Sequence, residues 1–332
     1  MRLASMSATC LVTGITGQDG GYLAEQLLAG GGSVHGLVHE GDPGVTDLLA
    51  RCPSVVLHIG DLLDEASLAA VVAAAGPDEV YNLAGISSVA FSWEQPVLTA
   101  DVSALGAGRL LEQVWQHQER TGRPVRFVQA SSAEVFGDAE VAPQDESTPL
   151  RPTSPYGAAK AYAHHLVGVY RGRGLHAVSA ILYNHESPRR PATFVTRKIT
   201  QGAALIAQGR ASELVLGNLD ARRDWGWAPD YVDALVRAAR HDDASDYVVA
   251  TGRAHSVRDF AQAAFARAGI VDWERHVRVD PALVRPVDAA VQVGDASRAR
   301  TRLGWKPTVD FAELVGRMVD ADLTTEPGRA AR

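Results

Sequence analysis

Short runs of apolar residues alternate along the chain with segments in which apolar positions recur every three or four residues. The short runs span residues 9–13, 33–38, 55–59, 79–83, 125–128 and 175–183. Such runs are typical of strands buried on both faces of a parallel sheet. The segments between them predict helices over 22–28, 63–75 (with Asp64 as N-cap) and 96–118, and a further helix from residue 156. Regular alternation of strand and helix through residue 183 predicts a doubly wound parallel α/β sheet.

Beyond residue 183 the alternation weakens. We expect a helix from 194 to about 209, a short strand over 214–216, a helix over 231–240 and a strand over 247–251 that returns to the main sheet. The sequence therefore predicts two parts. The first comprises residues 1–183 plus 227–265, and a smaller α/β lobe comprises residues 184–226 plus 266–332.

Composition narrows the range of partners. The formal net charge of −7 argues against a nucleic acid or an anionic membrane surface as partner. No apolar run reaches the roughly 18 residues needed to span a bilayer, and the first residues are too polar for a signal peptide. Only two cysteines are present, Cys10 and Cys52. We therefore expect a cytoplasmic protein without disulfides or a metal site.

A glycine-rich turn follows the first predicted strand. Gly14, Gly17 and Gly20 are spaced three apart and lead directly into a helix. In this context the first glycine permits a tight turn, the second lets backbone approach a pyrophosphate, and the third lets the helix lie close to the sheet. The free N–H groups of the helix N-terminus then hold the anion. The pattern predicts a dinucleotide-binding domain in the first part of the chain.

The ends of the next strands bear on the choice of dinucleotide. Residues His39, Glu40 and Asp42 follow the second strand, with no arginine before Arg51. An acid there favours the ribose 2′-hydroxyl of NAD, whereas an arginine favours the 2′-phosphate of NADP. The charge pattern favours NAD without deciding it. Asp61 follows the third strand, where it can reach an adenine amino group, and small residues at 84–85 follow the fourth.

Hydroxyl, carboxyl and amino groups gather after the fifth strand. Ser132 and Glu134 stand at its carboxyl end, and Tyr156 and Lys160 follow four residues apart in a predicted helix. Spacing of four places both side chains on one helical face. A cation beside a phenol lowers the phenol pKa and suits it to general-base catalysis. A pair of this kind also arises by chance on many helices, so its meaning depends on the rest of the chain.

Several motifs together resemble the extended short-chain dehydrogenases/reductases, and among these the GDP-mannose 4,6-dehydratase family. They keep the family's order over nearly the full length: Gly14-Ile-Thr-Gly-Gln-Asp-Gly20, Val80-Tyr-Asn-Leu-Ala84, Gln129-Ala-Ser-Ser132, Tyr156-x-x-x-Lys160, Asn184-His-Glu-Ser-Pro-Arg-Arg190, Phe194-Val-Thr-Arg-Lys-Ile199, Gly217-Asn-Leu-Asp-Ala-x-Arg-Asp-Trp-Gly226 and Leu303-Gly-Trp305. The segments from Asn184 and Gly217 are specific to the dehydratases. The glycine motif marks only the wider superfamily.

The resemblance implies a Rossmann-like fold and a tightly bound NAD or NADP that is regenerated in each turnover. It implies that Tyr156, assisted by Lys160, takes the proton of the sugar 4-hydroxyl while Ser132 orients that oxygen. Glu134 would then remove the C5 proton and protonate the departing 6-hydroxyl, giving GDP-4-keto-6-deoxymannose from GDP-mannose. It further implies cofactor contacts from Gly14, Thr16, Gly17, Gln18, Asp19, Gly20, His39, Asp61, Leu62, Leu83, Ala84, Gly85, Ser87, Thr99, Tyr156, Lys160, His185 and Arg190. Substrate contacts would come from Ser87, Ser132, Glu134, Asn184, Lys198, Leu216, Asn218, Arg223, Arg285 and Asp288.

Three departures from the family are visible. Ser132 replaces a common threonine and keeps its hydroxyl, whereas Ala133 stands where a serine is frequent. His39-Glu40 stands in place of a usual Arg-Arg pair, which weakens the family's preference for NADP. The resemblance also implies a homodimer or homotetramer.

Two other interpretations compete with a dehydratase. A nucleotide-sugar 4-epimerase or 4-reductase needs the Tyr–Lys pair but no C5 base, so Glu134 discriminates against it. A non-catalytic dinucleotide-sensing protein would be free to lose Tyr156, Lys160 or Glu134, and all three are present.

Overall fold

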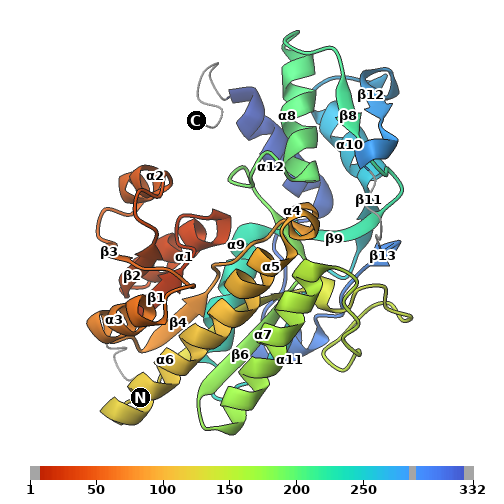
Figure 1. Ribbon diagram of the computed structural model, residues 1–332. Coiled ribbons are helices and arrows are strands. Elements are labelled where there is room, and N and C mark those ends of the chain that lie inside the picture. The colour runs from red at the N-terminus through yellow and green to blue at the C-terminus, as the bar shows by residue number, and fades with distance from the viewer. Residues whose placement is uncertain (1–7, 284–288, 325–332) are drawn as a thin grey trace.

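The computed structural model describes residues 8–283 and 289–324. A large parallel sheet with helices on both faces forms one part of the molecule, and a smaller lobe stands above one end of it (Figure 1). Within the described residues the main sheet has seven strands in the order β10-β6-β5-β4-β1-β2-β3. These strands are β1 (Thr9–Thr13), β2 (Ser33–Val38), β3 (Val56–Ile59), β4 (Glu79–Asn82), β5 (Arg126–Ser132), β6 (His176–Leu182) and β10 (Asp246–Val249). This confirms the predicted doubly wound α/β fold.

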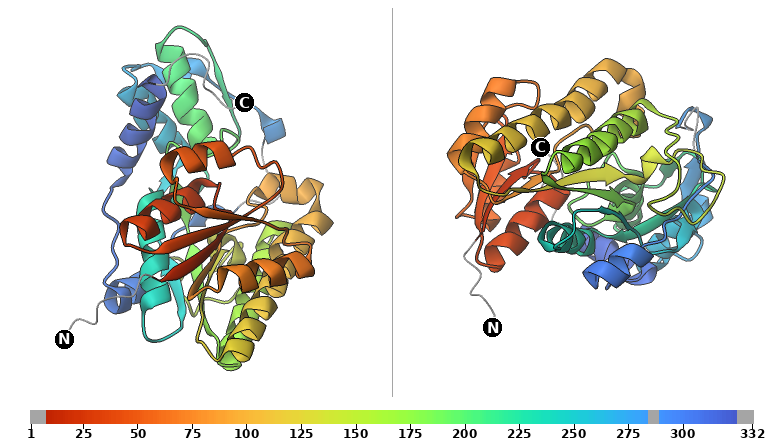
Figure 2. Two further views of the ribbon diagram at one scale, coloured as in Figure 1. Left: turned by 90° about the vertical axis from the view of Figure 1, so that its left-hand side faces the viewer. Right: turned by 90° about the horizontal axis from the view of Figure 1, so that it is seen from below.

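Helices cover the two faces of the sheet in separate layers, as the view from below shows (Figure 2). One face is covered by α3 (Glu65–Ala75), α6 (Gly106–Thr121) and α7 (Pro155–Gly172), and the other by α1 (Gln18–Ala29), α9 (Ala228–Arg240) and α11 (Ser297–Leu303). Neighbouring strand residues supply the two cores: Leu11 and Phe127 pack toward α3, α6 and α7, whereas Val12 and Val128 pack toward α1 and α9. Burial on both faces explains the continuous apolar runs of these strands.

Connecting elements complete this part of the chain. They are α2 (Val45–Arg51), α4 (Val89–Glu94), α5 (Pro96–Ala100), the π-helical turn η1 (Asp101–Leu105) and the 3-10 turn η2 (Ala133–Val135). The helix predicted over 96–118 is therefore interrupted by a π turn between α5 and α6. The helix predicted to begin at Tyr22 begins at Gln18, and the strand predicted over 125–128 extends to Ser132. Asp64 caps α3, as predicted, by accepting a hydrogen bond from the Ala66 N–H.

The smaller lobe has its own hydrophobic core. Its helices are α8 (Val195–Ala207), α10 (Val257–Arg267) and α12 (Phe311–Thr324), which pack against one another around Phe260, Phe265 and Met318. Its strands are β7 (Asn184–Glu186), β8 (Leu214–Leu216), β9 (Arg222–Trp227), β11 (Ala254–Ser256), β12 (Val277–Val279) and β13 (Val291–Gln292), with the short turns η3 (Trp273–His276) and η4 (Pro281–Leu283).

The two cores divide the chain differently from the predicted boundaries at two places. Helix α10 falls mostly in the 227–265 segment assigned to the first part, but it places Phe260 and Phe265 in the core of the smaller lobe. Helix α11, within the 266–332 segment assigned to the smaller lobe, places Ala299 and Leu303 in the core of the main sheet together with Trp305. The reason is that each helix buries its apolar face against whichever core it reaches, so the chain crosses between the two parts more often than its pattern indicates.

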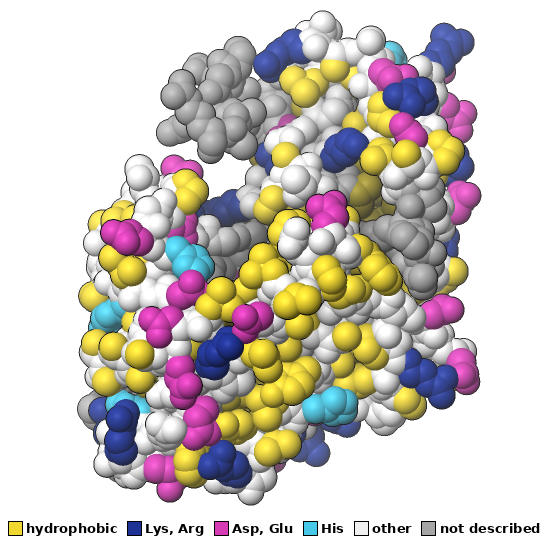
Figure 3. All heavy atoms as spheres, viewed as in Figure 1, with side chains coloured by type: hydrophobic (Ala, Val, Ile, Leu, Met, Phe, Trp, Pro, Cys, Tyr) yellow, Lys and Arg dark blue, Asp and Glu magenta, His cyan; other side chains and the backbone are white. Residues whose placement is uncertain are grey.

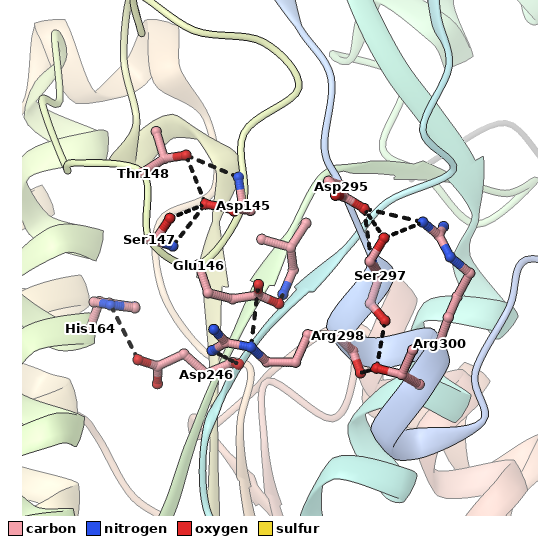
Figure 4. A network of polar contacts seen from close by, with 12 residues as sticks. Asp145, Glu146, Ser147, Thr148, His164, Asp246, Asp295, Ser297, Arg298 and Arg300 are labelled. Carbon is pink, nitrogen blue, oxygen red and sulfur yellow. Dashed lines mark hydrogen bonds and ion pairs between the residues drawn. The ribbon is translucent and has the colours of Figure 1, made fainter.

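A polar network fixes the long loop between η2 and α7 (Figure 4). The carboxylate of Glu146 accepts a hydrogen bond of 2.8 Å from the Val248 N–H on the edge strand β10, and its other oxygen lies 3.5 Å from Nε of Arg298 on α11. The backbone of Gln144 exchanges hydrogen bonds with Val293 and Asp295. The loop that joins η2 to α7 is thus held to the edge strand β10 and to α11.

Candidate active site

The predicted site residues gather where the strand order reverses, between β1 and β4, and along the carboxyl ends of the neighbouring strands β5 and β6. Ligands bind at this edge in open parallel sheets. The loops after β1 and β4 lie against each other, because a Cβ atom built on Gly14 would stand 2.8 Å from the Ala84 nitrogen. Gly14 also has φ of +67°, a conformation that L side chains rarely adopt.

The glycine turn leaves the start of α1 open to an anion. A Cβ atom on Gly20 would lie 2.2 Å from the Gly14 carbonyl oxygen, so only glycine lets the helix approach the turn this closely. Gly17 is the N-cap residue, and no side chain caps the helix. The N–H groups of the first turn are therefore available to a ligand. This geometry fits the pyrophosphate of a dinucleotide.

A hollow of about 370 Å³ opens beside the ends of β2 and β3. It is lined by His39, Glu40, Ile59, Gly60, Asp61, Asp64 and Ser67. Two predicted cofactor residues meet there, with Nδ1 of His39 3.9 Å from a carboxylate oxygen of Asp61. The hydroxyl of Thr16 donates a hydrogen bond of 2.8 Å to Asp42, which ties the glycine turn to the loop after β2. The walls of this hollow carry three carboxylates and neither lysine nor arginine.

Tyr156 begins α7 because Ser154 and Pro155 define the helix start. The Ser154 hydroxyl accepts a hydrogen bond from the Gly157 N–H, and Pro155 occupies the first helical position. Tyr156 is buried, with 8% of its surface exposed. Burial raises its pKa to about 12, against the opposing effect of a hydrogen bond with Ser132. Structure therefore brings Ser132 and Tyr156 together.

The expectation that Lys160 lowers the pKa of Tyr156 is wrong for this structure. The Lys160 ammonium lies 5.8 Å from the centre of the Tyr156 ring and donates a hydrogen bond of 2.9 Å to the Ala130 carbonyl oxygen. Burial lowers the pKa of Lys160 itself to about 8. Desolvation disfavours the charged phenolate, so it raises the pKa of Tyr156, whereas the expectation from sequence rested only on the attraction between ammonium and phenolate.

Glu134 stands next to this pair on the turn η2. Its N–H donates to the Ser132 hydroxyl at 3.3 Å, which starts the turn as soon as β5 ends. A Cβ atom on Gly157 would lie 2.5 Å from the Glu134 carbonyl oxygen, so the turn is pressed against the first turn of α7. The Glu134 carboxylate is near enough to raise the pKa of Tyr156. Hydroxyl, carboxylate and phenol thus share one small region.

A buried chain of hydrogen bonds, absent from the predicted site residues, runs beneath the site. Thr13 accepts from the Ala84 N–H at 3.1 Å and donates to Asn82 at 2.7 Å. The Asn82 amide donates to Gln129 at 2.8 Å, and the Gln129 amide donates to the same Ala130 carbonyl that holds Lys160. The sequence could have indicated this chain, because Thr13, Asn82 and Gln129 are polar residues in otherwise apolar strands, and buried polar side chains require hydrogen-bond partners.

Asp19 and His185 form a second buried pair. Nε2 of His185 lies 2.7 Å from an Asp19 carboxylate oxygen, and Nδ1 lies 2.7 Å from the Tyr183 carbonyl oxygen. Burial alone would lower the pKa of His185, but the Asp19 carboxylate outweighs it and raises the pKa. Gln18 donates to Asp19 and to the His185 carbonyl oxygen, and it accepts from the Ser187 hydroxyl. The start of α1 is thereby fastened to the segment after β6.

The two arginines of that segment face different partners. Nε of Arg190 lies 3.1 Å from Glu186, and its guanidinium stacks 3.7 Å above the Phe194 ring. Arg189 stacks 3.8 Å above the ring of Tyr22 on α1 and pairs with Glu25. Arg189 was not among the predicted residues, although it adjoins Arg190 in the same motif.

The remaining predicted cofactor residues differ in accessibility. Leu83 and Gly85 follow β4, and Ser87 is exposed beside them. Leu62 is buried in the core formed with α3 and α6. Thr99 is fully buried in α5, where its hydroxyl donates to the Gln95 carbonyl oxygen at 2.8 Å. Leu83, Gly85 and Ser87 are therefore accessible to a ligand, whereas burial restricts contact with Leu62 and Thr99.

The predicted substrate residues lie on neighbouring segments of the smaller lobe. Asn184 begins β7, which pairs with β9, and Lys198 is half-buried on α8. Leu216 is buried at the end of β8, whereas Asn218 is exposed and accepts from the Asp220 N–H. The Arg223 guanidinium donates to the Ala289 carbonyl oxygen at 2.7 Å. Arg285 and Asp288 lie outside the described residues.

Residues 8–283 and 289–324 offer neither a metal-binding cluster nor a membrane-spanning helix. These residues contain no group of three or more His, Cys, Asp or Glu side chains arranged to hold a metal ion. No helix among them is long and apolar enough to cross a membrane.

Comparison with known proteins gives consistent matches. The family model for GDP-mannose 4,6 dehydratase matches residues 11–318. GDP-mannose 4,6 dehydratase 1 of Arabidopsis thaliana is 47% identical over 94% of this chain and 89% of its own length. The human GDP-mannose 4,6 dehydratase is 43% identical over 94% of this chain and 91% of its own. Among solved structures, UDP-glucose 4-epimerase of Thermus thermophilus with NAD has a TM-score of 0.83 at 29% identity, covering 96% of this chain and 99% of its own.

Proposed function

The chain belongs to the GDP-mannose 4,6-dehydratase family, and we propose that residues at the end of β5, on η2 and at the start of α7 carry out the dehydration. The protein is a nucleotide-sugar 4,6-dehydratase, a hydro-lyase that converts GDP-mannose to GDP-4-keto-6-deoxymannose. Superfamily relatives such as the epimerases share the fold, while the family model and the relatives above identify the dehydratase branch.

Tyr156 is the proposed base for the sugar 4-hydroxyl. Its phenol is buried at the site next to Ser132, whose hydroxyl opposes the rise of the Tyr156 pKa and is proposed to hold the same sugar oxygen. Because burial raises the pKa of the phenol to about 12, the tyrosine rests protonated at neutral pH. A positive charge brought next to it by ligands would favour the phenolate. Lys160, whose ammonium is fixed 5.8 Å from the ring centre by the Ala130 carbonyl oxygen, is proposed to add to that charge, since it does not lower the pKa of Tyr156 by itself.

Glu134 is the proposed acid and base at C5 and C6. The 4-ketone acidifies the C5 proton, the Glu134 carboxylate removes it, and the same proton then leaves with the 6-hydroxyl as water. The turn η2 holds Glu134 against the first turn of α7, so its carboxylate and the Tyr156 phenol act on one sugar ring. An epimerase needs no base at this position, which is why Glu134 is the discriminating residue.

The chain uses NAD or NADP, in accord with its family and with the NAD-bound relative. The uncapped start of α1 and the glycine turn fit the pyrophosphate, and the hollow beside His39 and Asp61 fits the adenosine. When bound, this cofactor accepts hydride from C4 of the sugar and returns it to C6. Asn184, Lys198, Asn218 and Arg223 are proposed to hold the nucleotide sugar, with the arginine suited to its pyrophosphate.

The observation that carries the proposal is the meeting of Ser132, Glu134 and Tyr156 where β5 ends and α7 begins. Purified protein incubated with GDP-mannose should give a product lighter by one water and carrying a 4-ketone, measured by mass spectrometry before and after borohydride reduction. An isomer of unchanged mass would instead identify an epimerase. Absence of any product with both NAD and NADP added would contradict the proposal.

We also propose that the protein is a homodimer in the cytoplasm. Figure 3 shows hydrophobic side chains gathered over one face of the molecule. Large apolar side chains are exposed on α4, α5, η1 and α7, namely Phe91, Trp93, Val97, Leu98, Leu105, Tyr162 and Val169. Exposed apolar surface gathered on neighbouring helices favours a protein interface. In a two-fold dimer the same surface of both subunits is paired, so each copy would bury the apolar face of the other. Both cysteines are free and buried, which suits a reducing compartment.

A further inference from the structure

Both ring nitrogens of His185 already face hydrogen-bond acceptors inside the protein. Nε2 lies 2.7 Å from the Asp19 carboxylate and Nδ1 lies 2.7 Å from the Tyr183 carbonyl oxygen. Neither acceptor has a proton to donate, so both bonds form only when both nitrogens carry hydrogen. Doubly protonated imidazole is a cation, and the ring is 8% exposed. The geometry therefore describes a buried ion pair.

This ion pair lies at the start of α1. Asp19 is the second residue of the helix, in the turn whose free N–H groups fit a pyrophosphate. A carboxylate there interacts favourably with the helix dipole but repels a bound anion, and it costs affinity unless it is neutralised. The His185 cation, at 2.7 Å, is the neutralising charge in this position.

Other charged or titratable groups face the pair from the elements around it. Arg190 adds positive charge that acts on both Asp19 and His185. Asp19 in turn acts on Lys160 and Tyr156 of α7. The ring of Tyr231 on α9 stacks on His185 with 4.7 Å between centres and stays neutral, since burial raises its pKa. Among the hydrogen bonds of the described residues, none joins Asp19 to Arg190, Lys160, Tyr156 or Tyr231.

We propose that His185 is a positioning residue that acts on the cofactor through Asp19: it cancels the charge of that carboxylate and holds it in place. Direct contact between His185 and the cofactor is not required, because both of its donors are already used. The inference rests on the proposed binding of NAD or NADP at the start of α1. It differs from the role expected for His185 from sequence, which was a cofactor contact.

A double-mutant cycle separates the two roles. Cofactor-free protein is titrated with NAD and with NADP, followed by calorimetry. His185→Gln leaves an uncompensated carboxylate beside the pyrophosphate and should weaken binding by at least about tenfold. Asp19→Asn removes the repelling charge, so the double variant Asp19→Asn/His185→Gln should return to within about threefold of the wild-type affinity.

The outcomes are distinct. A double variant that binds as weakly as His185→Gln would show that His185 contacts the cofactor itself, and it would overturn the inference. Wild-type protein that binds neither dinucleotide would instead overturn the proposed function.

A second measurement does not depend on the folding of any variant. Nitrogen NMR of histidine-labelled wild-type protein should find both ring nitrogens of His185 protonated at about pH 7, above the ordinary histidine pKa of about 6.5. A neutral ring under those conditions would also overturn the inference.

Discussion

The Lys160 ammonium donates a hydrogen bond of 2.9 Å to the carbonyl oxygen of Ala130, on the strand next to its own helix. The same carbonyl accepts from Gln129, the last member of the buried chain of hydrogen bonds that begins at Thr13, the last residue of β1. The position of this ammonium group is therefore set by three strands, β1, β4 and β5, and not only by the helix that carries it. This arrangement also makes Lys160 a destabilising residue.

Replacing Lys160 by Met should raise stability while it lowers activity. Burial lowers the pKa of Lys160 from 10.5 to about 8, so keeping the charge costs the fold about 3 kcal/mol at neutral pH, at 1.36 kcal/mol per pKa unit. Loss of the bond to Ala130 offsets about 1 kcal/mol of the gain. We expect Lys160→Met to raise the free energy of unfolding by about 2 kcal/mol at pH 7 and to reduce turnover by at least about a hundredfold.

The gain should depend on pH. Between pH 8 and 10.5 the unfolded wild-type chain binds more protons than the folded one, so wild-type stability rises with pH and the difference from Lys160→Met narrows. Urea unfolding at about pH 7 and about pH 10 measures this. A variant less stable than wild type at the lower pH would contradict the prediction.

Tyr156→Phe should lower turnover by about a thousandfold or more, because it removes the proton acceptor for the sugar 4-hydroxyl. Affinity for the cofactor should stay within about threefold of wild type. Tyr247→Phe is the control, since Tyr247 is also buried but lies on β10. Steady-state kinetics and calorimetry are the measurements; turnover of Tyr156→Phe within about threefold of wild type would place the base elsewhere.

Glu134→Gln should separate the two halves of the reaction. The C4 oxidation needs Tyr156 and not Glu134, so mixing with GDP-mannose should still produce the absorbance of reduced nicotinamide. Release of the dehydrated product should fall by at least about a hundredfold, because the C5 proton has no acceptor. Product formation at the wild-type rate would remove Glu134 from its proposed role.

NAD should support activity at least as well as NADP. The 2′-phosphate of NADP carries roughly two negative charges, and the hollow at the ends of β2 and β3 is lined by Glu40, Asp61 and Asp64 without an arginine or lysine. Titration of cofactor-free protein with each dinucleotide gives the test. NADP binding tighter by more than about tenfold, or 1.4 kcal/mol, would contradict it. Glu40→Arg should shift the preference toward NADP.

Val97→Glu should convert the proposed dimer to a monomer. Val97 is 80% exposed within the apolar surface of α4, α5, η1 and α7, and a carboxylate buried there in an interface would lack a partner. Val271→Glu is the control, because Val271 is 89% exposed and lies outside that surface. Analytical ultracentrifugation at micromolar concentration distinguishes the outcomes; a monomeric wild-type protein would refute the dimer itself.

The sequence by itself determined the fold class and was enough to predict where the candidate site lies. Continuous apolar runs are required of strands buried on both faces, and Leu11 and Val12 do face opposite cores. The glycine turn after β1 and the polar residues after β5 follow from local rules, since each concerns neighbours in the chain. Ser132, Glu134 and Tyr156 could therefore be identified before their contacts were known.

Only the tertiary structure decided what those residues experience. Burial raises the pKa of Tyr156, against the sequence-based expectation, and lowers the pKa of Lys160, because desolvation depends on everything packed around a group. His185, the partner of Asp19, is 166 residues away in the chain. Helix α10 packs in the core of the smaller lobe and helix α11 in the core of the main sheet, the reverse of what their positions in the chain predicted. Hydrophobic periodicity records which face of an element is buried but not which surface buries it, and that choice required the folded chain.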